Sequence, residues 1–395
     1  MGSIKKDVVE GLAALLVCTF GDYVSGIFLH LAKPIIASFP FILGLLPIAS
    51  DARGDVYSSY GSRLGTLLHL GIGDRYMKIE LLSLTVLIVY VNLWIALLYY
   101  VLANVLCLPS ANPVTLIFIV LLSATLSACF MIPTTTVVAR VAFRKGLDPD
   151  NIVSPIATFF GDMVTIPTLL AGLYASWILS SGVQLAVIAL LVSLATAFLV
   201  VMVRRCRRGI HTYRRGIRIV MECLATVIVA TSFSAVAGVV LTKNLDVVLC
   251  GGLLAVVPAF LEDGGAIACR FSSKLSTAIH LGKLRLRPVP RDPWIARQIL
   301  VNLIHSTMVF ALVGVFGATI TFLSNTVVDY VFIIFATVQL AGMLLTVIMS
   351  VVTYYLALLA FKLGLDPDNV LAPILTSIAD ALGTTLLVTT YLLIA

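Results

Sequence analysis

Long apolar stretches separated by short polar connections run through the chain from the first residues to the last. Each stretch has about 20 residues or more, enough to cross about 30 Å of hydrocarbon as a helix. The pattern therefore predicts an all-α membrane protein with eleven transmembrane helices and leaves no stretch for a folded soluble domain. The predicted spans are 8–32, 35–58, 81–107, 114–143, 152–179, 182–203, 217–242, 245–268, 295–324, 329–361 and 370–394.

One predicted span has an alternative. Residues 35–72, taken as one helix, would be about 57 Å long at the usual rise per residue, so two crossings are conceivable there. Two crossings would place the basic loop at 283–291 on the opposite side of the membrane from the loop at 204–215. The charge pattern favours a single crossing, with residues 59–72 continuing into the cytoplasmic interface.

Composition and charge agree with a membrane protein. Hydrophobic residues make up 60% and charged residues 11% of the chain, and the mean hydropathy is +1.10, which excludes an ordinary soluble domain. The net charge of +7 is concentrated in loops that eleven crossings place on one side. That side is predicted to be cytoplasmic in the plasma membrane, with the amino terminus inside and the carboxyl terminus outside. Anionic lipid headgroups, not nucleic acid, are the expected neighbours of these loops.

Two sequence motifs occur twice. SRLGTLLHLG at 62–71 returns as SKLSTAIHLG at 273–282, and AFRKGLDPDN at 142–151 returns as AFKLGLDPDN at 360–369. The offsets of 211 and 218 residues define two five-helix repeats, 5–179 and 216–395, joined at 180–215 by a linker helix and a basic loop. Five crossings plus the linker give both repeats the same orientation, so we expect a pseudo-twofold axis along the membrane normal and a monomeric pseudo-dimer.

Acidic residues within the apolar spans are the candidate functional residues. Each costs at least ~2.5 kcal/mol near the bilayer centre, so they are expected to face a wet cavity, a cation or a partner. Seven of the nineteen acidic residues lie in the spans, and the other twelve are assigned to loops or helix ends. Few basic residues share the helices that carry these seven acids, and all of them lie in the second-helix motif, at Arg53, Arg63, Arg270 and Lys274. The seven acids are Asp22, Asp51, Asp55, Asp162, Glu262, Asp263 and Asp380.

The donor atoms indicate a hard cation. Carboxylates and hydroxyls dominate the spans, and no His–Cys cluster points to zinc or copper. Mg²⁺ dehydrates reluctantly and is usually held by one or two carboxylates with its waters retained. Two aspartates facing each other, Asp162 and Asp380, would suit hydrated Mg²⁺ as the transported ion, with no cofactor required. Calcium, manganese and sodium remain alternatives on this chemistry.

The DPDN segments also have a structural interpretation. Asp148 and Asp366 are suitable helix caps, with Pro149 and Pro367 at the first helical position. Asp22 corresponds to Ser234 in the second copy, so it lacks a repeated acidic partner.

These motifs resemble the membrane domain of the MgtE magnesium channels and, more closely, the duplicated solute carrier family 41 transporters. The resemblance covers essentially the whole chain. Its most specific part is a signature that runs from DPDN through Pro and Thr to Asp. The second-helix motif departs from the family, because the usual Asn is Asp55 in one copy and Ala266 in the other. The signature reads Asp148, Pro149, Asp150, Asn151, Pro155, Thr158 and Asp162, then Asp366, Pro367, Asp368, Asn369, Pro373, Thr376 and Asp380.

The resemblance implies Mg²⁺ passage between two five-helix units, with Asp162 and Asp380 binding the ion. The predicted function is therefore divalent-cation transport. An acidic cluster toward the cytoplasmic end would concentrate cations or hold a gate. One alternative is an exchanger coupled to Na⁺ or H⁺, and a remote one is an intramembrane enzyme, although the His–Glu–His spacing of a metalloenzyme is missing. The cluster comprises Asp51, Asp55, Glu262 and Asp263.

Overall fold

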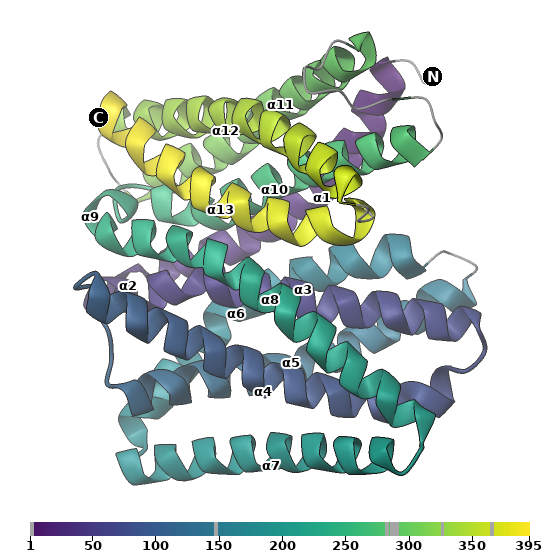
Figure 1. Ribbon diagram of the computed structural model, residues 1–395. Helices are drawn as coiled ribbons and strands as arrows, with labels where there is room; N and C mark the ends of the chain where they lie inside the picture. Colours follow the sequence, from purple (N-terminus) through teal and green to yellow (C-terminus); the bar gives the residue numbers. More distant parts are fainter. Residues whose placement is uncertain (1–3, 146–148, 281–283, 285–291, 325–327, 364–366) are drawn as a thin grey trace. The chain divides into compact units, whose positions relative to one another are not determined.

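The computed structural model describes residues 4–145, 149–280, 284, 292–324, 328–363 and 367–395. Within these residues every regular element is an α-helix, so the predicted all-α class is confirmed. The helices (Figure 1) are α1 (Ile4–Leu31), α2 (Lys33–Ser38), α3 (Phe41–His69), α4 (Gly73–Val105), α5 (Pro113–Arg144), α6 (Pro149–Ile178), α7 (Ser181–Arg207), α8 (His211–Lys243), α9 (Leu245–Val248), α10 (Leu253–His280), α11 (Pro293–Leu323), α12 (Val328–Lys362) and α13 (Pro367–Ile394).

Two predicted spans are divided in the structure. The stretch 35–58 contains the end of α2 and the start of α3, which begins after Pro40 and then continues unbroken to His69. The stretch 245–268 contains the short α9 and the start of α10, with Gly251 at a φ of +49° between them. Glycine tolerates this backbone conformation better than other residues, so the chain can change direction there.

Eight helices of the described chain are long and apolar enough to cross a membrane. Helices α1, α3 and α10 are not among them, and α3 and α10 carry most of the charged residues that the sequence analysis placed inside spans. The count of eleven crossings therefore stays a prediction. The eight spans are Tyr76–Val105, Pro113–Arg144, Ile156–Ile178, Ser181–Arg207, His211–Lys243, Pro293–Leu323, Asp329–Lys362 and Leu371–Ile394.

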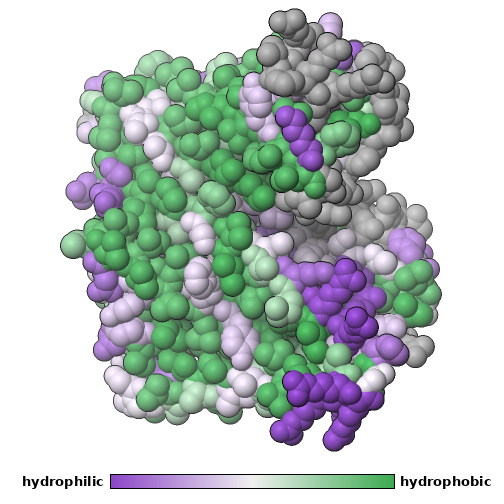
Figure 2. Space-filling model, in the orientation of Figure 1, coloured by the Kyte–Doolittle hydropathy of each residue, from purple (hydrophilic) through white to green (hydrophobic). Residues whose placement is uncertain are grey.

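Many apolar side chains are exposed on the outer helices, and the face visible in Figure 2 is mostly hydrophobic. Helix α7 is the least covered, with only 11% of its most apolar stretch buried. It packs on α4 and α5 and leaves side chains such as Leu185 and Leu190 exposed. In a membrane protein such a surface is in contact with lipid tails.

The helices form two compact units. The α3–α6 unit comprises residues 39–235, and the α10–α13 unit comprises residues 1–38 together with 236–395. In the α3–α6 unit, α3 packs against α4, α5 and α6, and α5 packs against α4 and α6. In the α10–α13 unit, α10 packs against α11, α12 and α13, and α12 packs against α11 and α13. The contacts among the four helices α3–α6 therefore repeat those among α10–α13.

Helix α1 falls in the α10–α13 unit, and residues 211–235 of α8 fall in the α3–α6 unit, so the first helix of each sequence half lies wholly or mainly in the unit built by the other half. Helix α1 packs against α10 and α11. The amino-terminal part of α8 contacts α4, where Ser83 Oγ donates to the Gly216 carbonyl at 3.3 Å, and α3, where Cys223 approaches Ser59. The compact units therefore do not follow the order of the sequence. The repeats 5–179 and 216–395 and their symmetry axis stay predictions.

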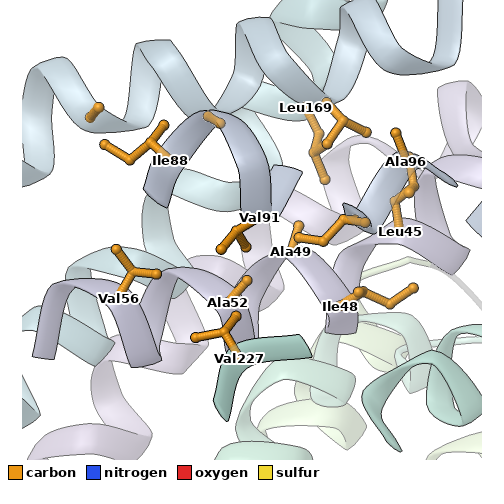
Figure 3. Close-up of a cluster of buried hydrophobic side chains, with 14 of the residues drawn as sticks. Leu45, Ile48, Ala49, Ala52, Val56, Ile88, Val91, Ala96, Leu169 and Val227 are labelled. Carbon is orange, nitrogen blue, oxygen red and sulfur yellow. The ribbon is translucent and has the colours of Figure 1, made fainter. Parts of the chain in front are cut away.

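The core of the α3–α6 unit encloses α3 along most of its length (Figure 3). Leu45, Ile48, Ala49 and Val56 of α3 are buried, and Val227 of α8 belongs to the same cluster. Between helices in a membrane, close packing of this kind supplies much of the association energy. The packing determines where the acidic residues of α3 lie.

Candidate cation site

A close contact between two helices positions the repeated aspartate in each unit. A Cβ atom added to Gly54 of α3 would lie 3.7 Å from Cγ2 of Thr158 of α6. In the other unit, a Cβ atom added to Gly265 of α10 would lie 3.2 Å from Cγ2 of Thr376 of α13. Small residues allow helices to approach this closely. Asp162 and Asp380 lie one helical turn after these threonines. Each aspartate therefore has the same position relative to the helix contact in its own unit.

The acidic residues of the α3–α6 unit form one connected group. Ser50 Oγ donates a hydrogen bond to Asp162, and Ser234 Oγ of α8 donates one to Asp51. The Asp51 carboxylate interacts electrostatically with both Asp55 and Asp162. Carboxylates this close repel one another, so the group favours a cation or protons among them.

In the α10–α13 unit, α1 contributes to the acidic region. Thr19 Oγ1 lies 2.9 and 3.0 Å from the two carboxylate oxygens of Asp263, which is fully buried. Asp22 is 1% exposed, and both Asp22 and Asp263 interact electrostatically with Tyr23. The structure thus brings Asp22 into the region of Asp263, although the sequence analysis found no repeated partner for it.

Asp380 and Glu262 lie on separate helices of the same unit. Asp380 of α13 is 7% exposed, and its backbone carbonyl accepts a hydrogen bond from Thr384 Oγ1 at 2.8 Å. Glu262 of α10 is partly buried beside Asp263 in the sequence. Asp380 is therefore largely removed from solvent, as an ion-binding carboxylate inside a membrane protein is expected to be.

The described residues contain no group of three or more His, Cys, Asp or Glu side chains close enough to ligate a metal directly. A protein usually holds Mg²⁺ through one or two carboxylates while several waters stay bound. The donor set of the α3–α6 unit, with its carboxylates and hydroxyls, fits a hydrated ion better than a dehydrated one.

The repeated DPDN segments are only partly described. Helices α6 and α13 begin at Pro149 and Pro367, in agreement with proline at the first helical position. Asp148 and Asp366, the proposed caps, lie outside the described residues. Residues 285–291 of the basic loop also lie outside them.

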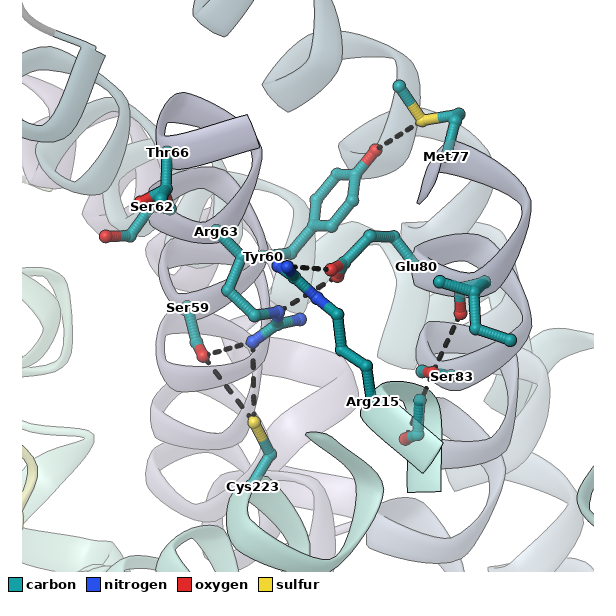
Figure 4. Close-up of polar contacts among 12 residues, drawn as sticks. Ser59, Tyr60, Ser62, Arg63, Thr66, Met77, Glu80, Ser83, Arg215 and Cys223 are labelled. Carbon is teal, nitrogen blue, oxygen red and sulfur yellow. Dashed lines mark hydrogen bonds and ion pairs between the residues drawn. The ribbon is translucent and has the colours of Figure 1, made fainter. Parts of the chain in front are cut away.

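Sequence reasoning missed the role of Glu80. It was assigned to a loop or helix end, whereas the structure places it inside α4 with a side chain that is 0% exposed. The carboxylate is held by Arg63 Nε of α3 at 2.9 Å and by Arg215 Nη2 of α8 at 3.3 Å (Figure 4). These partners are far apart in the sequence, so no local pattern could have identified the pairing.

Arg53 was named from the sequence only as a basic residue of the second helix, and the structure adds its surroundings. It lies on α3 between Asp51 and Asp55 and is 4% exposed. Its Nη2 atom donates to Ser123 Oγ of α5 at 2.6 Å. The sequence shows an arginine between two acids in a helix, but it does not show that this arginine is buried or that a hydroxyl group is its partner.

The comparison with protein families identifies the chain. The model of the MgtE family, described as divalent cation transporter, matches residues 46–172 and 257–390. The chain belongs to the MgtE family. It is therefore a multi-pass membrane transporter of divalent cations and not an enzyme. The two matched segments contain most of α3–α6 and of α10–α13, the two sets of four helices with the same contacts among themselves.

Relatives of this MgtE-family chain include named solute carriers. Solute carrier family 41 member 3 of Rattus norvegicus is 24% identical over 434 residues, covering 99% of this chain and 88% of the relative. Member 3 of Mus musculus is 24% identical over 387 residues, covering 90% and 75%. Member 2 of Mus musculus is 26% identical over 262 residues, covering 62% and 44%. No solved structure matches the chain.

Proposed function

We propose that this MgtE-family chain transports Mg²⁺ and that Asp162 and Asp380 bind the hydrated ion. The observation that carries the proposal is the position of Asp162. It lies one turn after the Gly54–Thr158 helix contact, accepts a hydrogen bond from Ser50, and interacts with the Asp51 carboxylate. The same glycine, threonine and aspartate recur at Asp380.

The acidic residues on α3 and α10 have a supporting role in this proposal. Asp51, Asp55, Glu262 and Asp263 raise the local concentration of cations and help to hold the ion's water shell. A conducting site has to bind the ion well enough for entry and weakly enough for release. Contacts through water meet both requirements, because the ion keeps most of its hydration energy.

The proposed setting follows from the distribution of charge. The protein would lie in the plasma membrane with its amino terminus in the cytoplasm and its carboxyl terminus outside. The arginines that end α7, and the exposed Arg214 of α8, would contact anionic lipid headgroups. The duplicated sequence supports a functional monomer.

Mg²⁺ influx into proteoliposomes tests the proposal. We expect Asp162→Asn and Asp380→Asn each to lower the initial flux by at least about tenfold, the effect of ~1.4 kcal/mol of lost ion stabilisation. The double variant should be close to the liposome background. Asp246→Asn, at an exposed carboxylate of α9, is the matched control and should transport normally. Normal flux through the double variant would remove both aspartates from the mechanism.

The second candidate is an exchanger that couples Mg²⁺ to Na⁺ or H⁺. It is favoured by the chemical difference between the copies, because Arg53 and Asp55 correspond to Gly264 and Ala266 at the 211-residue offset. A passive pore does not require such a difference. Mg²⁺ flux that is unchanged when Na⁺ and pH gradients are removed would contradict coupling, whereas flux that collapses without one of them would identify the coupled ion.

A further inference from the structure

A buried positive charge lies inside the acidic group of the α3–α6 unit. Arg53 is 4% exposed and lies two residues from Asp51 and from Asp55 on α3. Its charge also acts on Asp162 of α6. The backbones of α3 and α6 are close at this level, since a Cβ atom added to Gly161 would lie 3.7 Å from Arg53 Cβ. A fixed cation therefore shares the region proposed for the transported cation.

Hydroxyl groups hold the guanidinium group. Arg53 Nη2 donates to Ser123 Oγ at 2.6 Å, and Ser123 Oγ in turn donates to Thr168 Oγ1 at 3.0 Å. Ser127 Oγ lies 3.1 Å from the same Thr168 oxygen. We call Ser123, Ser127 and Thr168 the hydroxyl cradle. It comes from α5 and α6, whereas the carboxylates nearest in the sequence come from α3.

The guanidinium group is incompletely satisfied in this position. Within the described part of the chain, Arg53 Nε and Nη1 are buried and have no hydrogen-bond partner. No carboxylate oxygen of the described residues forms an ion pair with Arg53 within 4.0 Å. Buried charged donors of this kind are costly, and such an exception calls for a physical explanation.

A second position for the guanidinium group would explain why Nε and Nη1 have no hydrogen-bond partner and why Arg53 forms no ion pair in the described residues. An arginine side chain is long enough to turn from a hydroxyl toward a carboxylate on the neighbouring helix α6, where a planar guanidinium forms strong paired hydrogen bonds. Near Asp162 it would neutralise the carboxylate in the absence of an ion. At the hydroxyl cradle it leaves the carboxylate available.

We propose that Arg53 is a tethered counter-cation that competes with Mg²⁺ for the Asp162 carboxylate and withdraws to the hydroxyl cradle when the ion binds. This inference rests on the proposed role of Asp162. Competition by a built-in cation weakens binding and so speeds release of the ion. The second copy has Gly264 at the corresponding position, so the competitor is a property of one half only.

Two substitutions should move the Mg²⁺ affinity in opposite directions. Arg53→Gln removes the competing charge but keeps a hydrogen-bond donor for Ser123. We expect its half-saturating Mg²⁺ concentration in proteoliposome flux to fall by about tenfold, a change equivalent to ~1.4 kcal/mol. Ser123→Ala removes the acceptor that holds Nη2, so the guanidinium stays with the carboxylate and the half-saturating concentration rises.

Two controls accompany these variants. Arg53→Lys keeps the charge but loses the planar guanidinium, so its half-saturating Mg²⁺ concentration should shift less than that of Arg53→Gln. Arg218→Gln removes an arginine charge from an exposed pair with Glu222 and should not change the Mg²⁺ dependence. Unchanged half-saturation in both Arg53→Gln and Ser123→Ala, or a shift of both in the same direction, overturns the inference.

The experiment also separates this inference from the proposed function. If Asp162→Asn transports Mg²⁺ normally, the proposed function is wrong. If Asp162→Asn is inactive while Arg53→Gln and Ser123→Ala keep the wild-type Mg²⁺ dependence, only the role of Arg53 is wrong. If a thermal unfolding assay shows that Arg53→Gln does not fold, the Ser123→Ala variant alone tests the inference. A rise in its half-saturating Mg²⁺ concentration supports the role of Arg53, and no change or a fall overturns it.

Discussion

Glu80 should be among the most sensitive positions for the stability of the α3–α6 unit. Its fully buried carboxylate joins α4 to α3 through Arg63 and to α8 through Arg215. Arg63 is further held by Ser59 Oγ, 2.6 Å from its Nη1 atom. Glu80→Gln keeps the side-chain shape but leaves two arginines without the opposite charge. The substitution therefore removes an electrostatic link between three helices (Figure 4).

The magnitude follows from burial. Removing one partner of a buried ion pair costs about 3–5 kcal/mol, because the remaining charge is left uncompensated. Arg215→Gln should cost less, about 1.5–3 kcal/mol, the range for a hydrogen bond to a charged group. Arg215 is 33% exposed, and Arg63 still compensates the carboxylate in that variant.

Equilibrium unfolding in mixed detergent micelles would measure these free energies. Glu222→Gln is the matched control, because Glu222 pairs with Arg218 on the surface of α8, with side chains 62% and 78% exposed. An exposed pair of this spacing contributes only about 0.3–0.5 kcal/mol. Equal losses of unfolding free energy for Glu80→Gln and Glu222→Gln would refute the reasoning. So would a Glu80→Gln loss that disappears at high salt, because a buried pair is weakly screened.

Two further predictions concern helix packing and the ion. Gly26→Ala should destabilise the protein by about 1–3 kcal/mol, because its Cβ atom would lie 2.0 Å from the Ala255 carbonyl oxygen and force α1 away from α10. Gly182→Ala, where a Cβ atom would meet nothing within 4 Å, should be neutral or stabilising in the same equilibrium unfolding assay. Equal effects of the two substitutions would show that the close contact at Gly26 is unimportant. Mg²⁺ at 100 times its dissociation constant should stabilise the wild type by about 2.7 kcal/mol. This gain should vanish with a chelator and in the Asp162→Asn/Asp380→Asn variant, and its persistence in that variant would mean that the ion binds elsewhere.

The helical class was predictable from the sequence because each apolar stretch has the length of a membrane-spanning helix. Helix boundaries were predicted well where proline begins a helix, as at Pro293 of α11 and Pro113 of α5. They were less accurate around Pro40 and Gly251, where apolar residues continue across a break in the backbone. The hydropathy pattern indicates which residues are buried in lipid or protein, but it does not show where the helical backbone is interrupted.

The candidate site was partly predictable. Asp162 and Asp380 could be identified because a carboxylate in an apolar helix is costly and because both recur in a repeated signature. The partners of these acids could not be identified. Ser50 and Ser234 are unremarkable serines in the sequence, and only the packing of α3 with α6 and α8 brings them to Asp162 and Asp51.

The sequence by itself determined the helical character of the chain, its duplication and the family to which it belongs, because these depend on residue types and their spacing. The tertiary structure alone decided which helices share a unit. Helix α1 packs with α10 and α11, while the start of α8 contacts α3 and α4. Duplicated helices present similar surfaces, so the same pattern of apolar residues is compatible with either arrangement. Only the complete set of contacts between side chains distinguishes them.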